Sequence, residues 1–519
     1  MRGIVLAFGL ILTGPAQAQE SADRVAPEGT GTGSLQVPAM LAASAEAKAA
    51  GRPVAADHWM ISAANPLAVE AGARVLAQGG TAADAMVTVQ AVLGLVEPQS
   101  SGLGGGAFLV WHDAATGEIT TLDGRETAPL GVTPQLFQDA AGKPLAFFDA
   151  VIGGRSVGVP GTPALLAEAH ARWGRADWPG LFTDAIRLAE DGFAVSPRLA
   201  TLVARDAERL ALFPTTRTYF LPDAEPVQAG DILRNIPYAR SLRILAEEGP
   251  AAFYTGAIAA DIVARVQGAA DNPGLLTETD LAIYRIRERP AVCAPYRAFE
   301  VCGMGPPSSG GVTVAQILGL LAPFDLVGLG PDSPQAWRLI GDASRLAFAD
   351  RGRYLADSDF VPVPVEGLLS PDYLTPRSDL MRRNDALPEV APGDPEFDHA
   401  LDWGDGRSFE RPSTSHVSIV DQYGNALGMT ASIENGFGSR LMVRGFLLNN
   451  QLTDFSFASH VEGRAIANAV APAKRPRSSM APTILRREGQ PVLVLGSPGG
   501  SRIIGYVAKT IIAWVDWGM

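Results

Sequence analysis

The sequence predicts a mixed α/β (α+β) fold, and three observations carry that prediction. Helical apolar periodicity runs through much of 155–290. A glycine run opens an apolar segment at 107–112, and alternating apolar runs flank a Gly-Asn turn after Thr414. The 519 residues are 47% hydrophobic and 19% charged, a composition typical of a globular protein with a large core.

The N-terminal residues predict export. Residues 1–18 have the pattern of a secretory signal: Arg2 is the positive start, Ile4–Leu12 the apolar run, and Ala16-Gln17-Ala18 the small-residue cleavage pattern. The alternative is a cytosolic N-terminal helix. The apolar run is too short to span a bilayer, and no later segment predicts a membrane anchor. We expect a protein that is secreted or periplasmic after removal of 1–18.

Elements of the N-terminal half follow from composition and spacing. Residues 19–56 are rich in Ala, Gly, Ser and Pro and predict a loose leader. Apolar periodicity predicts helices over Thr81–Leu95, Pro163–Trp173 and Leu242–Glu248.

The glycine run Gly102-Leu103-Gly104-Gly105-Gly106 precedes a predicted strand over Ala107–His112. No P-loop Lys-Ser/Thr follows the run, which excludes that kind of phosphate cradle. We therefore expect the glycines to allow close backbone packing.

The only two cysteines, Cys293 and Cys302, flank a predicted hairpin with Pro295 near its turn. An exported protein could close them into a disulfide; two buried thiols are the alternative. Six scattered histidines, with no CxxC or HExxH pattern, predict no metal centre, and no cofactor is expected. The net charge of −13 argues against nucleic acid or an anionic membrane as partner, but not against a small anionic substrate.

A polar loop leads into a predicted hairpin at the C-terminal side of the chain. Ala386–Ser413 is rich in Pro, Asp and Gly, which predicts an exposed loop. Strands are predicted over Val417–Val420 and Ala426–Ile433, joined by a turn at Tyr423-Gly424-Asn425.

The hydroxyl pair Ser413-Thr414 lies where this loop meets the first of these strands. Cleavage between the two would give Thr414 a free α-amine beside its own hydroxyl, and an N-terminal threonine can act as nucleophile with its amine as base. By themselves these residues also fit an ordinary strand entered from a polar loop.

Several sequence blocks decide between these alternatives. The chain resembles the γ-glutamyltransferase family of N-terminal nucleophile hydrolases in blocks that follow the family order: Glu97–Gly106, Leu122–Pro129, Pro306–Gly311, Thr414-Ser415-His416, Leu447–Ser456, Lys474–Met480 and Gly496–Arg502. The resemblance implies a four-layer αββα sandwich, with two antiparallel-rich sheets between helical layers. It also implies a large-subunit region at 57–413 and a small-subunit region at 414–519, separated by cleavage at Ser413-Thr414.

The resemblance implies catalytic roles for particular residues. Thr414 would be the nucleophile, first in self-cleavage and then on the γ-glutamyl carbonyl. Thr430 and Ser432 would lie on one face of the neighbouring strand, with Ser432 bonded to the nucleophile. Gly499 and Gly500 would present backbone N–H groups to the oxyanion.

The resemblance also implies how the substrate head is held. Arg125 would clamp the α-carboxylate, with hydroxyl donors from Ser478 and Ser479. Asp454, supported by Gln451, would take the α-ammonium.

The chain departs from the family pattern in its acyl pocket. Glu434 stands where well-studied members have an asparagine, and the next residue, Asn435, is expected on the other face of the strand. Segment 457–473 matches the lid of some bacterial relatives but lacks their capping tyrosine.

A further departure concerns the C-terminus. The chain stops at Met519, in a helix expected to begin near Ile503, where relatives continue into further strands. The expectation is a C-terminally truncated small-subunit region with exposed apolar surface and impaired maturation.

The leading hypothesis is an exported, self-processing γ-glutamyltransferase and glutathione hydrolase. Its partners would be a small γ-glutamyl substrate, water or an amino acid or peptide as acceptor, and its own two subunits. One alternative is a cephalosporin or glutaryl acylase on the same scaffold, favoured by Glu434 and the uncapped lid. Another is a catalytically silent γ-glutamyl-binding protein.

Overall fold

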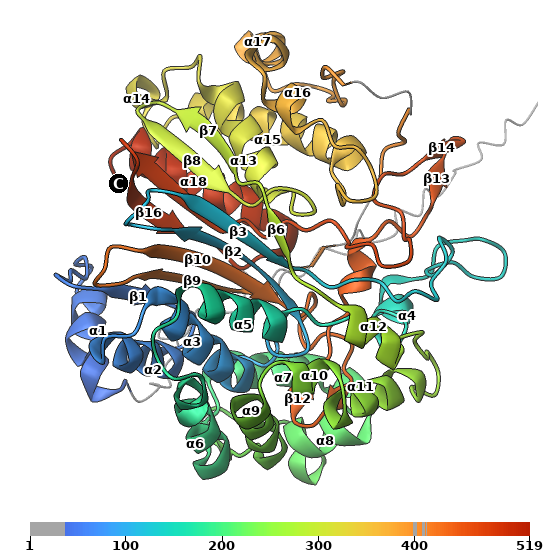
Figure 1. The fold of residues 1–519 in the computed structure, drawn as a ribbon. Helices are drawn as coiled ribbons and strands as arrows, with labels where there is room; N and C mark the ends of the chain where they lie inside the picture. The colour runs from blue at the N-terminus through green and yellow to red at the C-terminus, as the bar shows by residue number, and fades with distance from the viewer. Residues whose placement is uncertain (1–36, 398–401, 407–409, 412) are drawn as a thin grey trace, which may run out of the picture.

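The computed structural model describes residues 37–397, 402–406, 410–411 and 413–519 (Figure 1). The predicted signal segment lies outside the described residues. Among the helices of the described part, none has the length and apolar character needed to cross a membrane.

A six-stranded antiparallel sheet crosses the middle of the molecule (Figure 1). Its strands, in spatial order, are β1 (Met60–Ser62), β9 (Ser415–Val420), β10 (Ala426–Ser432), β2 (Gly106–His112), β3 (Ile119–Gly124) and β6 (Arg287–Arg289). The strands that follow Thr414 therefore lie between strands from the first third of the chain.

A second antiparallel sheet packs on the first. Its order is β16 (Gln490–Leu495), β15 (Thr483–Arg487), β8 (Phe299–Gly303) and β7 (Val292–Tyr296). Val110, Ala426 and Ile484 form a small buried cluster where the two sheets meet.

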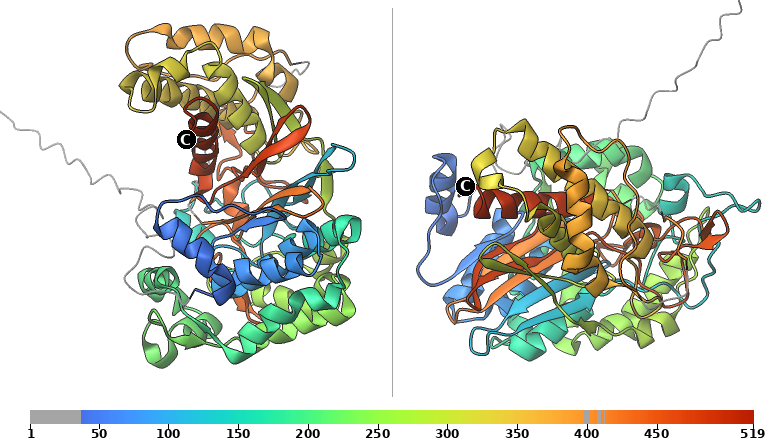
Figure 2. Two further views of the ribbon diagram at one scale, coloured as in Figure 1. Left: turned by 90° about the vertical axis from the view of Figure 1, so that its left-hand side faces the viewer. Right: turned by 90° about the horizontal axis from the view of Figure 1, so that it is seen from above.

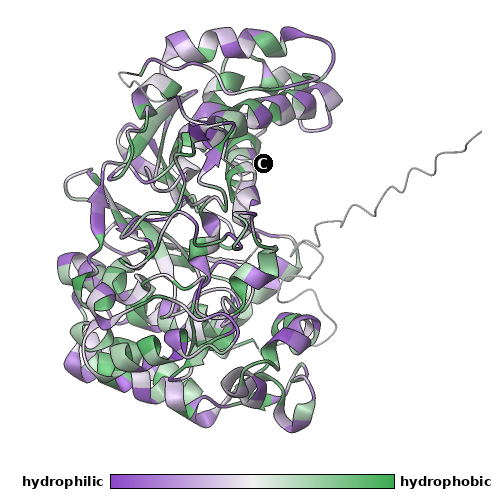
Figure 3. Ribbon diagram, turned by 90° about the vertical axis from the view of Figure 1, so that its right-hand side faces the viewer, coloured by the Kyte–Doolittle hydropathy of each residue, from purple (hydrophilic) through white to green (hydrophobic). Residues whose placement is uncertain are grey.

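Helices cover the outer face of each sheet, so the molecule has the predicted four layers (Figure 2). Apolar residues of α2 (Pro66–Ala77), α3 (Ala82–Val96) and α5 (Thr162–Trp173) share one core with β9 and β10. Those of α13 (Gly310–Leu321), α15 (Pro334–Tyr354) and α18 (Ile503–Val515) share another with β8, β15 and β16. Hydrophilic and hydrophobic residues mix along the outer helices, as expected where one face packs on a core (Figure 3).

The remaining helices surround these layers. They are α1 (Ala42–Ala49), α4 (Phe147–Val151), α6 (Thr183–Asp191), α7 (Pro197–Leu210), α8 (Pro214–Phe220), α9 (Ile236–Glu248), α10 (Ala251–Tyr254), α11 (Ala257–Gln267), α12 (Glu278–Ile283), α14 (Leu326–Leu329), α16 (Val365–Leu369) and α17 (Pro371–Asp379). Short strand pairs complete the fold: β4 (Phe193–Ala194) with β5 (Ile232–Leu233), β11 (Met442–Val443) with β12 (Phe446–Leu447), and β13 (His460–Val461) with β14 (Arg464–Ala465).

The strongly periodic predictions are confirmed. The Thr81–Leu95 helix is α3, which begins after Thr81 because the Thr81 hydroxyl and the Asp84 carboxylate cap its first turn. The helix over Pro163–Trp173 is α5, and Leu242–Glu248 forms the last part of α9. The predicted leader is less irregular than expected: its alanine-rich residues 42–49 form α1, none of whose residues is buried.

The glycine run allows close packing, as predicted. A Cβ on Gly104 would lie 2.1 Å from the Leu447 carbonyl oxygen, and one on Gly105 would lie 2.2 Å from that of Ser432. The run therefore lets β2 enter the sheet directly against the backbone of the C-terminal segment.

The two cysteines lie opposite each other in the β7–β8 hairpin and form a disulfide, with their Cα atoms 4.1 Å apart. Of the two alternatives, the structure has the disulfide. The hairpin turn follows Tyr296, so Pro295 lies in β7 near the turn, as predicted.

Candidate active site

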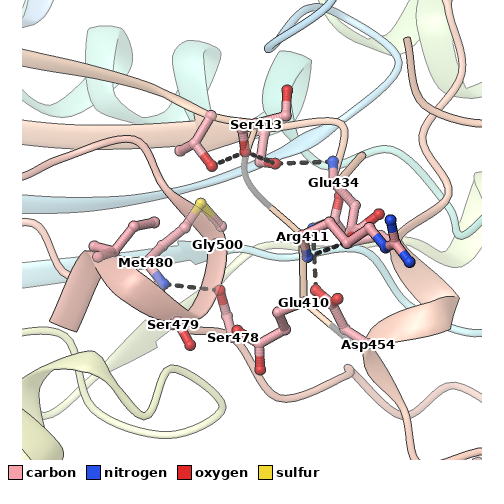
Figure 4. A pocket seen from close by; sticks show the side chains of 13 residues that line it. Glu410, Arg411, Ser413, Glu434, Asp454, Ser478, Ser479, Met480 and Gly500 are labelled. Atoms are coloured by element: carbon pink, nitrogen blue, oxygen red, sulfur yellow. Dashed lines mark hydrogen bonds between the residues drawn. The ribbon is translucent and has the colours of Figure 1, made fainter. Parts of the chain in front are cut away.

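Thr414 directly precedes β9 and lines a pocket. Figure 4 shows this pocket from close by. The pocket is lined by Glu410, Arg411, Ser413, Thr414, Ser432, Glu434, Gln451, Asp454, Ser478, Ser479, Met480, Gly500 and Ile503. Most of the predicted site residues are therefore brought together; Arg125, Thr430 and Gly499 are not among the lining residues.

Ser413 and Thr414, which the scissile peptide bond joins, are both buried. The Thr414 hydroxyl donates to the carbonyl oxygen of Ser413, and the Ser432 hydroxyl lies 3.4 Å from the same oxygen. The Ser413 hydroxyl donates to the Gln99 carbonyl at 2.8 Å. In the uncleaved chain, Ser432 thus contacts the carbonyl before the nucleophile rather than the nucleophile's hydroxyl.

Thr430 faces a histidine instead of the pocket. It pairs with His416 across β9 and β10, and its hydroxyl lies 2.8 Å from Nδ1 of that ring. The Nε2 atom lies 2.9 Å from the Ser418 hydroxyl, which donates to the Val494 carbonyl of the second sheet. Burial lowers the pKa of His416 to about 3, so the ring is neutral.

The predicted oxyanion glycines lie just before α18, where Gly500 begins a 3-10 turn, Gly500–Arg502, that leads into the helix. Gly499 has φ 139° and Gly500 φ 58°, in the left-handed region that favours glycine. A Cβ on Gly500 would lie 2.6 Å from the Arg411 carbonyl oxygen. Gly500 lines the pocket, and the helix that starts here adds its positive N-terminal end.

Arg125 and Asp454 contact each other in the uncleaved chain. Nη2 of Arg125 lies 2.5 Å from Oδ2 of Asp454, and the guanidinium also donates to the carbonyls of Pro476 and Arg477. Gln451 donates to Asp454 at 3.4 Å. Burial raises the pKa of Asp454 to about 7, although the charge of Arg125 acts in the opposite direction.

Glu434 lies beyond the end of β10, with φ 73°. Its carboxylate accepts the backbone N–H of Arg411 at 3.0 Å and the side-chain amide of Asn450. Burial, followed by the nearby charge of Asp454, holds its pKa well above the ordinary value. Because the strand ends at Ser432, the alternation assumed for Asn435 does not apply; its side chain accepts from Arg440 at 2.8 Å.

Three charged residues at the site were missed by the sequence interpretation: Arg351, Glu410 and Arg411. The apolar lining residues Met480 and Ile503 were also not predicted. Arg351 donates to the Ser479 hydroxyl at 2.8 Å and to the Glu410 carboxylate. Burial would raise the pKa of Glu410, but the charges of Arg351 and Arg477 lower it below its usual value. Nothing local distinguishes these residues, because Arg351 is one of several charges on α15 and Glu410 belongs to a polar loop.

The segment that matches the family lid contains the β13–β14 hairpin. Within the described residues, 457–473 contributes no side chain to the pocket lining.

Comparison with known proteins agrees with this fold. The family model for gamma-glutamyltranspeptidase matches residues 68–519. The chain is 38% identical to the glutathione hydrolase proenzyme of Bacillus subtilis over 468 residues, which cover 89% of this chain and 78% of that protein. It is 37% identical to the corresponding proenzyme of Escherichia coli (90% and 80% covered). It is also 35% identical to the acylase ACY 1 proenzyme of a Pseudomonas species (90% and 81% covered).

Solved structures give the same result. The cephalosporin acylase of Bacillus halodurans superposes with a TM-score of 0.78 at 26% identity, covering 90% of this chain and 83% of that one. The γ-glutamyltranspeptidase of Helicobacter pylori superposes with a TM-score of 0.63 at 33% identity, covering 66% and 97%. The match over nearly the whole chain shows that this protein belongs to the γ-glutamyltranspeptidase family of N-terminal nucleophile hydrolases.

Proposed function

We propose that this chain is the precursor of a γ-glutamyltransferase that also hydrolyses glutathione. The observation that carries the proposal is the position of Thr414: its hydroxyl contacts the carbonyl of Ser413 inside a pocket lined by Ser478, Ser479 and Asp454. That pocket offers a nucleophile, hydroxyl donors and a carboxylate within one buried site.

Self-cleavage would proceed through an ester. The Thr414 oxygen attacks the carbonyl carbon of Ser413, its proton passes to the departing amide nitrogen, and the C–N bond breaks. Water then hydrolyses the ester, which leaves a carboxylate on Ser413 and a free amine on Thr414. The large subunit would be 57–413 and the small subunit 414–519, after export directed by 1–18.

Turnover would use the new N-terminus. The Thr414 amine accepts the hydroxyl proton as the oxygen attacks the γ-glutamyl carbonyl. The backbone N–H groups of Gly499 and Gly500 stabilise the tetrahedral oxyanion, a contribution commonly worth about 100-fold or more in rate. The amine leaves with a proton, and water or an amino acid or peptide then takes the acyl group. Ser432 supports the nucleophile, and Thr430 supports β9 through His416.

The head of the substrate carries a carboxylate and an ammonium. Ser478, Ser479 and Arg125 would serve the carboxylate, whereas Asp454, Gln451 and Glu434 would serve the ammonium. Opening of the Arg125–Asp454 contact by a zwitterionic ligand satisfies both ions, because each gains an opposite charge.

A denaturing gel tests maturation. Full-length protein should give two bands and Thr414→Ala a single band, because the variant lacks the attacking oxygen. A single wild-type band after prolonged incubation would contradict the proposal.

Acylase activity is the second candidate, favoured by the buried carboxyl of Glu434 in the pocket that Thr414 lines and by similarity to acylases. Release from γ-glutamyl-anilide and glutaryl-anilide separates the two, since only the former has an α-ammonium. Preference for the glutaryl compound would identify an acylase.

A further inference from the structure

We propose that Arg351 is a further carboxylate-binding residue of the acyl-donor site, and that Glu410 occupies its place in the uncleaved chain. The inference rests on the proposed function in one respect: it takes Ser479 as a contact of the donor's carboxylate. The sequence indicated neither Arg351 as a binding residue nor an uncleaved state in which the chain's own Glu410 fills the site.

Arg351 is an almost completely buried cation that donates to two residues of the pocket lining, Ser479 and Glu410. Its side chain extends from α15 and is only 6% exposed. Nε donates to the Ser309 hydroxyl at 2.8 Å, and Nη2 donates to the pocket residue Ser479 at 2.8 Å. The serine hydroxyls orient the guanidinium, but neutral hydroxyls cannot balance its charge.

Glu410 supplies the anion while the chain is intact. Its carboxylate accepts from Arg351 and receives a hydrogen bond from the Ser479 hydroxyl. The charges of Arg351 and Arg477 keep it ionised by lowering its pKa against the effect of burial. In the uncleaved chain the Glu410 carboxylate therefore already contacts the Ser479 hydroxyl, which is expected to bind the carboxylate of the acyl donor.

The next residue occupies the other half of the site. The backbone N–H of Arg411 donates to Glu434 at 3.0 Å, and the Arg411 guanidinium lies 4.4 Å from the centre of the Phe147 ring. Glu434, which is expected to accept from the substrate's ammonium, thus accepts from the Arg411 N–H in the uncleaved chain. Glu410 and Arg411 together place a carboxylate and a donor where a zwitterionic head would place its own.

Cleavage at Ser413 changes what holds this pair. Glu410 would then lie three residues before a free C-terminus at Ser413, no longer tied to β9. A diffusing carboxylate can replace it on Arg351, and the buried guanidinium requires such a replacement when Glu410 leaves.

The test in the mature enzyme compares γ-glutamyl-anilide with two analogues, each of which lacks one of its two charged groups. γ-Glutamyl-anilide has both charges, glutaryl-anilide has only the carboxylate, and 4-aminobutyryl-anilide has only the ammonium. Arg351→Gln should lower kcat/KM for the first two about 10- to 100-fold, mainly through KM, because a charge-assisted hydrogen bond is lost. The value for 4-aminobutyryl-anilide should stay near that of the unsubstituted enzyme. Equal losses on all three substrates, or no loss, would overturn the proposal.

The matched control is Arg353→Gln on the same helix, whose guanidinium pairs with the exposed Asp405. It should leave all three values unchanged. The comparison remains informative if glutaryl-anilide is the preferred substrate, because that compound keeps the carboxylate; preference alone would contradict the proposed γ-glutamyl specificity and not the role of Arg351.

A binding measurement covers the case in which Arg351→Gln fails to mature. In full-length Thr414→Ala, which stays uncleaved, calorimetry should detect no binding of glutarate because Glu410 fills the site. Thr414→Ala/Glu410→Ala should bind glutarate, and adding Arg351→Gln should abolish that binding. Glutarate binding that is equal in the first two proteins, absent from both, or unaffected by Arg351→Gln would refute the inference.

Discussion

At the scale of single residues, the pocket is notable for buried carboxyl groups beside the nucleophile. Asp454 and Glu434 both have raised pKa values, because burial disfavours their charged forms. A carboxyl group binds an ammonium well only when it is ionised. Binding of the substrate's ammonium should therefore depend on the pH at which these carboxyl groups lose their protons.

The pKa of Asp454, about 7, predicts a pH-dependent preference. As the pH falls below 7, Asp454 becomes protonated and attraction for the α-ammonium is lost. The ratio of kcat/KM for γ-glutamyl-anilide to that for glutaryl-anilide should rise with pH up to about 7 and then level off. Taking the ratio cancels titration of the Thr414 amine, which both substrates share. A ratio that is independent of pH between 5 and 8 would contradict this role.

At the scale of elements, the β9–β10 hairpin positions Thr414. Its turn is held by Asp421, whose carboxylate accepts the backbone N–H groups of Tyr423 and Asn425 at 3.0 Å each. The same carboxylate accepts the N–H of Ala82 at the start of α3. One buried side chain thus fixes both the hairpin and the helix beneath it.

Asp421→Ala should lower the free energy of unfolding by about 3 kcal/mol, because buried donors lose a charged acceptor. Urea denaturation in the uncleaved Thr414→Ala background would measure the change without interference from processing. Asp113→Ala is the matched control: Asp113 accepts two N–H groups in the exposed β2–β3 turn. It should cost less than about 1 kcal/mol. Similar losses for the two variants would argue against a special role for Asp421.

At the scale of the whole molecule, cleavage would cut a chain whose halves share one sheet. β9 pairs with β1 and β10 pairs with β2, each in an antiparallel register. The apolar residues of β9 and β10 lie in the same core as those of α2 and α3. The cut removes one peptide bond and leaves these contacts in place.

The two products should therefore remain together after processing. Native size-exclusion chromatography should give one species close to the size of the precursor, while a denaturing gel of the same fraction gives two bands. Elution of separate fragments under native conditions would contradict the shared-sheet arrangement.

Much of the fold was predictable because it depends on local sequence. The spacing around Gly424 predicted the β9–β10 hairpin, and the apolar periodicity after Thr81 predicted α3. Prediction failed where a short irregular step interrupted a local pattern. β10 ends at Ser432, and the positive φ of Glu434 turns the chain, so strand alternation did not place Asn435.

The sequence by itself determined the family, the four-layer fold and the residues expected to carry the chemistry, because motifs and periodicity are properties of the chain. Only the tertiary structure decided which buried charges meet. Arg125 pairs with Asp454, 329 positions away, and Arg351 joins Ser479 to Glu410. A buried ion needs an opposite charge nearby, and that partner can come from any part of the chain that folding brings close. Local sequence therefore does not predict which charges pair.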